Sequence, residues 1–207
     1  AERKRFEAEV QRHLPEQLCH FAYSNSGAEA NEKAYALARL MGPGGKRVLA
    51  FEGSFHGRTL LSLYSTWNKV KREPYQIRGY EVEFTPFPGG GGKATQPEVT
   101  PEWLAFWSAP QGKTMEAPAG DSLMAKEIAC LEALQAALEQ GNVCAVNLEP
   151  MQSEGGDNYG TARFFNGLRC LTRAYGIPLI MDEVQTGFGL GGTFFWHQQF
   201  QLKKADG

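Results

Sequence analysis

Hydrophobic and polar positions along the chain follow two kinds of spacing. Apolar residues recur at helical spacing from about Ser26 to the GPGG at 42–45, over 121–141 and over 161–175. Short apolar runs predict strands at 47–52, 143–149 and 177–182, and the alternating YEVEF at 80–84 predicts a half-exposed or edge strand. Helices and strands in this order predict an α/β fold with a mostly parallel sheet flanked by helices.

Polar residues and glycines mark the ends of the predicted helices. Ser26 followed by Glu29 forms a capping-box pattern, Asp121 is a candidate N-cap, and Gly141 follows the end of that second helix. The charged start AERKRFEAEV predicts an amphipathic helix, and the aromatic FFWHQQF at 194–200 predicts a helix packed on the core. Between 86 and 120 the chain is rich in glycine and proline without periodicity, which predicts a long irregular excursion over the surface.

Two predicted strands end in acids, Glu149 after VNL and Asp182 after LIM. Ligands of open α/β sheets bind outside the carboxyl ends of the strands, so both acids are expected in one crevice. A single strand-end acid more often caps the next helix or meets solvent. Two acids with the same placement, each in a glycine-containing polar loop, favour a binding site. Glu183 should point to the opposite face, in a local structural role.

A buried carboxylate needs a partner, and a charge-assisted hydrogen bond contributes about 1.5 to 3 kcal/mol. No lysine or arginine lies in the loop of Asp182. The protonated ring nitrogen of pyridoxal phosphate would serve, and that cofactor also needs a phosphate site and an aromatic platform. SNSGAEA offers small residues at a helix N-terminus for the phosphate, and Phe55 lies just past a strand end. Taken singly, an ordinary capped helix and a core phenylalanine explain these features better.

Composition narrows the kinds of partner. Of 207 residues 42% are hydrophobic, enough for a core, and the formal charge of -2 without a basic tract disfavours nucleic acid and anionic membranes. Cys19, Cys130, Cys144 and Cys170 are scattered and predict free thiols, and neither they nor the histidines predict a metal site. Without a signal peptide or a membrane-length apolar run, we expect a cytoplasmic protein that acts on a small molecule.

Four segments together resemble the class III pyridoxal-phosphate-dependent aminotransferases. They are NSGAEANE, FEGSFHGRT, EPMQSEGGD and DEVQTGFG, in the order in which that family carries them. FHGR and EPMQSEGGD are similar to the branch that transfers terminal amines, such as 4-aminobutyrate and L-lysine 6-aminotransferases. The resemblance implies a fold-type I large domain, pyridoxal 5'-phosphate, an amino donor, 2-oxoglutarate as acceptor, and a homodimer.

The resemblance also implies a role for individual residues. It places the cofactor against Ser26, Gly27, Ala28, Phe55, His56, Asp182, Val184 and Gln185, with Asp182 on the ring nitrogen, Val184 and Phe55 on the two ring faces, and Gln185 on the phenolic oxygen. Glu149, the other strand-end acid, is expected to bind the cofactor at the same crevice. The resemblance places Arg58 on the substrate carboxylate, and Glu154 as the acid that neutralises a second arginine, which is not identifiable here.

By the same resemblance, residues 1–207 are an incomplete large domain. The family's N-terminal segment, Schiff-base lysine region and C-terminal small domain are expected outside them, and Lys203 and Lys204 are not assigned as that lysine. We therefore expect the chain by itself not to complete transamination. Two alternatives stay open: another reaction of the same cofactor, such as an aminomutase, racemase or decarboxylase, and a non-catalytic binding module.

Overall fold

A four-stranded parallel sheet forms the centre of the protein in a computed structural model, which describes residues 1–75, 78–90 and 96–202. The strand order is β2-β1-β3-β6, where the strands are β1 (Arg47–Phe51), β2 (Glu81–Thr85), β3 (Val143–Leu148) and β6 (Leu179–Met181). The four predicted strands and their parallel pairing are confirmed. β2 lies at the edge of the sheet, as its alternating sequence predicted, and β3 is buried at every position, as a continuous apolar run requires.

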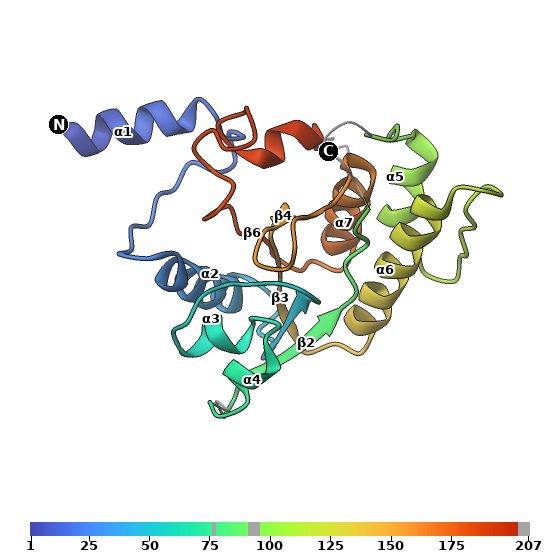
Figure 1. The fold of residues 1–207 in the computed structure, drawn as a ribbon, viewed down its shortest axis with the longest axis horizontal. Coiled ribbons are helices and arrows are strands. Elements are labelled where there is room, and N and C mark those ends of the chain that lie inside the picture. Colours follow the sequence, from blue (N-terminus) through green and yellow to red (C-terminus); the bar gives the residue numbers. More distant parts are fainter. Residues whose placement is uncertain (76–77, 91–95, 203–207) are drawn as a thin grey trace.

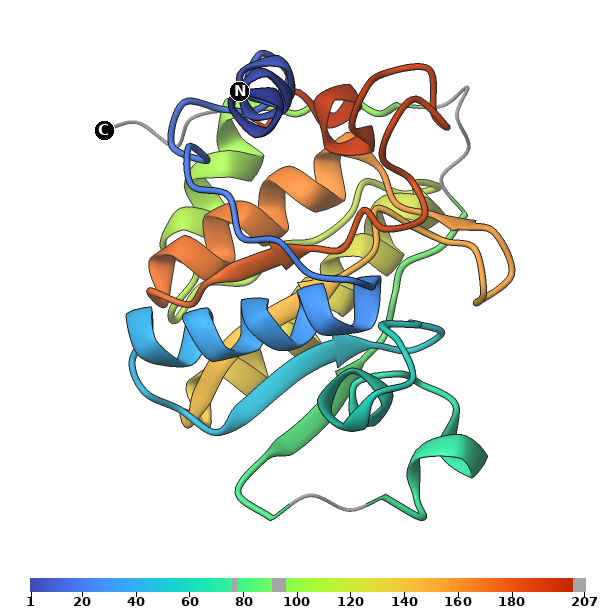
Figure 2. The ribbon, with the colours of Figure 1, turned by 90° about the vertical axis from the view of Figure 1, so that its left-hand side faces the viewer.

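Helices cover both faces of this sheet (Figures 1 and 2). One face carries α2 (Gly27–Met41) and α3 (Leu60–Tyr64), and the other carries α5 (Pro101–Ser108), α6 (Ser122–Glu139) and α7 (Ala162–Ala174). Outside these layers lie α1 (Glu2–Gln11), α4 (Lys69–Arg72), the antiparallel hairpin of β4 (Met151–Gln152) and β5 (Asn158–Tyr159), and the 3-10 helix η1 (Trp196–Phe200).

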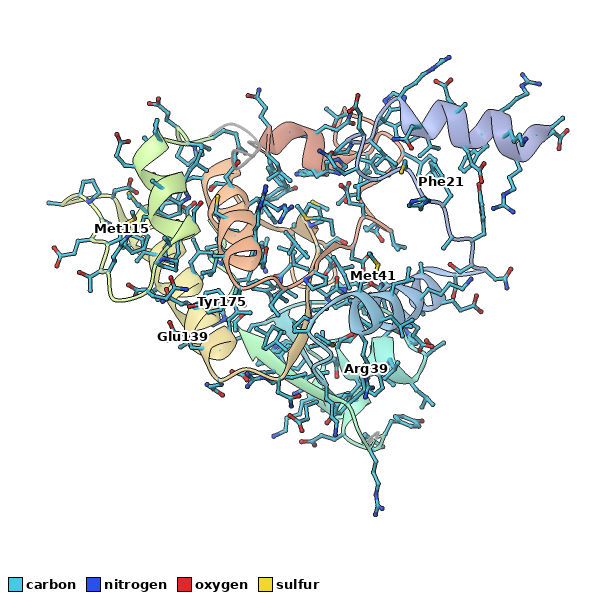
Figure 3. The ribbon with its side chains drawn as sticks, turned by 180° about the vertical axis from the view of Figure 1, so that it is seen from behind. Phe21, Arg39, Met41, Met115, Glu139 and Tyr175 are labelled. Carbon is cyan, nitrogen blue, oxygen red and sulfur yellow. The ribbon has the colours of Figure 1, made fainter. Side chains whose placement is uncertain are left out.

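The main core fills the space between the sheet and α5, α6 and α7. Phe164, Phe165 and Leu168 of α7 are fully buried there, and Trp196 and Phe200 of η1 pack onto the same cluster. FFWHQQF therefore packs on the core, as predicted. At the far end of the layer, Tyr175 Oη donates to Glu139 Oε1 at 2.9 Å and joins the ends of α7 and α6 (Figure 3).

The prediction of an irregular excursion over 86–120 was wrong in its centre, where α5 forms. Thr100 caps this helix by accepting from Trp103 N, and Pro101 occupies its first turn, where a missing N–H costs nothing. Trp103 and Trp107, four residues apart, are buried on one face, and Trp103 Nε1 donates to Arg163 O of α7. The Thr-Pro start and the tryptophan spacing were the sequence signals for this helix.

Candidate active site

The two strand-end acids lie side by side, as the sequence predicted. β3 pairs with β6 so that Leu148 is opposite Met181, and Asp182 N donates to Leu148 O at 2.8 Å. Glu149 and Asp182 therefore leave the sheet at the same edge. Both line a cavity of about 190 Å³, together with the predicted site residues Gly27, Ala28, Phe55, His56, Glu154, Val184 and Gln185.

The N-terminus of α2 forms one wall of the cavity. Ser26 Oγ accepts from Glu29 N at 3.2 Å, and Glu29 Oε2 accepts from Asn25 N at 2.8 Å, so the predicted capping residues satisfy two backbone donors. The N–H groups of Gly27 and Ala28, in the first turn, have no acceptor within the helix and lie at its positive end. Ser26 itself is exposed and is not among the residues that line the cavity.

Glycine allows the loop after β1 to approach this helix closely. Gly57 has a φ of +132°, and a Cβ there would lie 2.6 Å from Ala28 Cβ and 2.6 Å from Ser62 Oγ. A Cβ on Gly27 would likewise lie 2.7 Å from both methyl carbons of Val184. The short distances between these three segments explain why glycine occupies both positions.

Asp182 is buried and carries three hydrogen bonds from the chain. Its Oδ2 accepts from Asn31 Nδ2 at 2.8 Å and pairs with His56 Nδ1 at 2.8 Å, while its Oδ1 accepts from Val184 N at 3.1 Å. Burial raises the pKa of Asp182, but the hydrogen bonds and charge interaction from His56, with those from Asn31 and Val184, lower it more. The net effect is a pKa below the ordinary value, so Asp182 is ionised at neutral pH.

The sequence around Asp182 shows no cationic partner in its own loop, and the structure supplies a partner from another part of the chain. Its partner His56 is 126 residues away in sequence and comes from the loop after β1. The carboxylate nevertheless keeps capacity for one more donor: Oδ2 has two partners, whereas among the described residues Oδ1 accepts one hydrogen bond, from Val184 N. Asp182 lines the cavity, so its ionised carboxylate can accept a hydrogen bond from a cation there.

Glu149 has a different environment from its neighbour. It is 5% exposed, and its Oε2 accepts from Phe55 N at 2.8 Å. Burial raises its pKa, the Phe55 N–H lowers it, and the negative charges of Asp182 and Glu154 raise it again, to about 8. The site thus holds an ionised and a protonated carboxyl group next to each other near neutral pH.

Comparison with known proteins identifies this architecture. The protein-family model "Aminotransferase class-III" matches residues 1–206. The chain belongs to the class-III aminotransferase family. It is 34% identical over 176 residues to acetylornithine aminotransferase of Mycolicibacterium smegmatis, covering 85% of this chain and 34% of that protein. It is also 36% identical over 178 residues to the acetylornithine aminotransferase of Corynebacterium efficiens, again covering 85% of this chain and 34% of the relative.

Solved structures of transaminases have the same fold, that of the fold-type I enzymes. The lysine aminotransferase from M. tuberculosis in the internal aldimine form superposes with a TM-score of 0.72 at 25% identity, over 97% of this chain and 43% of that chain. An (S)-enantioselective omega-transaminase from Thermomicrobium roseum gives a TM-score of 0.73 at 25% identity, over 97% and 41%. The chain spans about a third of the length of the curated relatives named above.

The remaining predicted site residues of this aminotransferase family member are half-buried or exposed. Phe55 is half-buried, and Val184 and Gln185 are exposed. Glu154 is exposed and lines the cavity, whereas Arg58 is exposed, does not line it, and holds its guanidinium 6.0 Å from the centroid of the Phe55 ring.

Glu183 points away from the cavity, as the strand geometry predicted. It accepts hydrogen bonds from the backbone N–H of Trp196 and of His197 and pairs with His197 Nδ1 at 2.6 Å. These contacts anchor the start of η1 to the end of β6. Glu183 thereby restrains the segment that carries Val184 and Gln185.

Sequence reasoning missed Asn31, Gly57 and Ser153, which also line the cavity. Asn31 stands within NSGAEANE, a polar residue four positions after Gly27 on the inner side of the helix, and that position was the available signal. Lys203 and Lys204 lie outside the described residues.

No membrane or metal site is found in the part of the chain that the structure describes. Within 1–75, 78–90 and 96–202, no helix is both long and apolar enough to cross a membrane, and no three His, Cys, Asp or Glu side chains gather as metal ligands would. All four cysteines are free, with Cys19 exposed and the others buried.

Proposed function

We propose that this chain is the cofactor-holding part of a pyridoxal-phosphate-dependent aminotransferase. The enzyme takes the terminal amino group of an amine such as acetylornithine, lysine or 4-aminobutyrate and transfers it to a 2-oxo acid, 2-oxoglutarate. The observation that carries the proposal is the buried, ionised Asp182, which keeps a free acceptor at a cavity between a helix N-terminus and Phe55.

The residues that line the cavity support the proposal, because they offer a contact for each part of pyridoxal phosphate. The N–H groups of Gly27 and Ala28 would hold the phosphate, and Asp182 would hold the ring nitrogen. Ser26, which the resemblance also assigns to the phosphate, does not line the cavity in the ligand-free chain. Phe55 and Val184 would contact the two faces of the ring, and Gln185 and His56 would lie near its edge. When bound, the cofactor supplies an electron sink through its protonated ring.

The protein's own residues provide the electrostatic conditions for that chemistry. Asp182 keeps its negative charge in a buried place because His56 and Asn31 donate to it. Glu149 retains its proton near neutral pH, which limits the negative charge in the cavity. With the cofactor bound, the Asp182 carboxylate would hold a proton on the ring nitrogen.

Two exposed residues are suited to the substrate. An exposed guanidinium at Arg58 can bind a carboxylate with two parallel hydrogen bonds, and Glu154 lies at the cavity mouth where it can attract a cation. Acetylornithine and lysine, which the names of the relatives supply, share a carboxylate at one end and an amino group at the other. A cation beside Phe55 matches that arrangement.

We also propose that the complete enzyme is a homodimer. Val184, Phe188 and Leu190, in the loop beside the cavity, are 65%, 67% and 60% exposed. Large apolar side chains gathered on one loop are typical of a surface that a partner covers. Light scattering of the purified protein would give the mass, and a monomer at working concentrations would contradict this part of the proposal.

A visible spectrum of the complete gene product tests the cofactor. Pyridoxal phosphate should produce an absorption band at a longer wavelength than that of the free cofactor. Borohydride should then fix the cofactor to a lysine, which mass spectrometry would locate. Labelled acetylornithine, lysine and 4-aminobutyrate, each with 2-oxoglutarate, should yield labelled glutamate from at least one donor. Absence of the band in the complete protein would refute cofactor binding, and a band without transfer would refute the reaction.

A further inference from the structure

Asn31 lies where the three segments of the site meet. Its side chain is buried on α2, and its Nδ2 is 2.8 Å from Asp182 Oδ2, 3.0 Å from His56 O and 3.2 Å from Gly27 O. One amide group thus contacts the end of β6, the loop after β1 and the first turn of α2. These are the segments that carry the proposed cofactor contacts.

The surroundings of Asn31 fix the orientation of its amide. Its Nδ2 faces a carboxylate and two carbonyl oxygens, all acceptors, and its Oδ1 accepts from Asn147 Nδ2 at 3.1 Å. The reversed amide would place an oxygen against three acceptors. Asn147 Nδ2 also donates to Tyr35 Oη at 2.6 Å, and Tyr35 Oη lies 2.6 Å from Ser65 Oγ. A chain of buried polar groups therefore holds Asn31 in place from behind.

Asn31 donates to Asp182 without adding a charge. Together with His56 it occupies Oδ2, while Oδ1 receives only the Val184 N–H among the described residues. We propose that Asn31 is a positioning residue that fixes the Asp182 carboxylate, so that protein donors saturate one oxygen and the other is left for a cationic ring nitrogen. This inference rests on the proposed function, because it names pyridoxal phosphate as the source of that cation.

Two substitutions at Asn31 and one matched control test the role. Asn31→Leu removes the donor at similar volume, and Asn31→Asp keeps the shape but brings a carboxylate against Asp182. Asn166 of α7 is the control, since it is equally buried and donates to the carbonyl four residues before it, Ala162 O at 2.8 Å, and to Phe200 O at 3.0 Å. It contacts the core and does not line the cavity.

Equilibrium dialysis against pyridoxal phosphate, on the complete gene product, measures the first effect. Asn31→Leu should lower the affinity by about three- to tenfold, because a carboxylate that Asn31 no longer holds must lose its freedom when it binds the ring nitrogen. Asn31→Asp should also lower it, because two adjacent carboxyl groups cannot both stay ionised and Asp182 would lose part of its charge. Asn166→Leu should change the affinity by less than about threefold even if its melting temperature falls. Unchanged affinity in both Asn31 variants, or an equal loss in Asn166→Leu, would overturn the proposal.

The ring nitrogens of His56 give a second measurement that needs no cofactor. In nitrogen-15 spectra of the ligand-free protein, Asn31→Leu and Asn31→Asp should shift the His56 Nδ1 signal, because both alter the carboxylate that it contacts, and Asn166→Leu should not. An unmoved signal in both Asn31 variants would refute the positioning role even if the cofactor binds. If the wild type fails to bind pyridoxal phosphate, the proposed function fails, and the His56 signal alone then decides whether Asn31 positions Asp182. If Asn31→Leu does not fold, both measurements rest on Asn31→Asp, because aspartate has the same shape as asparagine.

Discussion

Replacing Glu149 with glutamine should remove a pH dependence from the stability of the fold. The Glu149 side chain is buried at the end of β3, and its Oε2 accepts a hydrogen bond from Phe55 N at 2.8 Å. Burial, opposed by the Phe55 N–H and reinforced by the charges of Asp182 and Glu154, raises its pKa from 4.5 to about 8. The folded protein therefore binds a proton at Glu149 over a range in which the unfolded chain has released it.

The sign and size of the effect follow from these two values. Below about pH 4.5 both states hold the proton, and the contribution of Glu149 to stability is fully present. As the pH rises from about 4.5 towards 8, the folded state still binds a proton that the unfolded chain has released. The free energy of unfolding therefore falls by about 1.4 kcal/mol per pH unit. Between about pH 5.5 and about pH 7.5 the loss amounts to roughly 2 to 3 kcal/mol.

Urea unfolding followed by tryptophan fluorescence measures this loss. Glutamine has almost the same shape, does not titrate, and keeps an oxygen that can accept from Phe55 N, so Glu149→Gln serves as its own structural control. The difference in unfolding free energy between wild type and variant should move in favour of the variant by about 1.4 kcal/mol for each pH unit. Parallel profiles, with a difference constant to about 0.5 kcal/mol, would refute the reasoning that Glu149 is protonated in the fold.

Three further substitutions test other contacts of the structure. Asp182→Asn should leave the protein folded but reduce pyridoxal phosphate retention by about tenfold or more in equilibrium dialysis, and unchanged retention would contradict its assigned role. Gly57→Ala should lower stability by about 1 to 3 kcal/mol in thermal denaturation, because φ is +132° and the new Cβ would lie 2.6 Å from Ala28 Cβ; an unaltered midpoint would count against that close packing. Arg163→Met should cost about 3 to 5 kcal/mol, because Glu127 is fully buried and loses the guanidinium nitrogen 2.6 Å away. Adding Glu127→Gln should recover much of that loss, and no recovery would show that the ion pair is not its cause.

The features that the sequence predicted correctly depend on local patterns. The strands and three large helices follow from apolar spacing, and the helix starts at Ser26 and Asp121 follow from capping, since each side chain accepts from a backbone N–H three residues later. The meeting of Glu149 and Asp182 follows from one topological rule, that parallel strands end at the same edge. None of these inferences needed contacts between distant side chains.

The features that sequence reasoning missed depend on such contacts. Asp182 obtains its ionised state from His56 and Asn31, which are 126 and 151 residues away in sequence. The pattern around His56 shows only a histidine in a glycine-containing loop, and spacing alone cannot reveal that its ring reaches the end of β6. The helix α5 was missed for a different reason, because flanking glycines and prolines concealed a short segment with only two buried tryptophans.

The difference between the two acids resolves a conflict in the proposed site. Two ionised carboxylates at adjacent strand ends would repel each other and would also repel the phosphate of the cofactor. The fold gives the two acids different protonation states. Asp182 accepts hydrogen bonds from His56 and Asn31 and stays charged, whereas Glu149 accepts from the backbone N–H of Phe55 and keeps its proton. In the proposed complex, one negative charge would face one ring cation, and the phosphate would meet the N–H groups of α2, which carry no formal charge. The number of donors that reach each carboxyl group, and not its position at a strand end, therefore determines what each acid contributes.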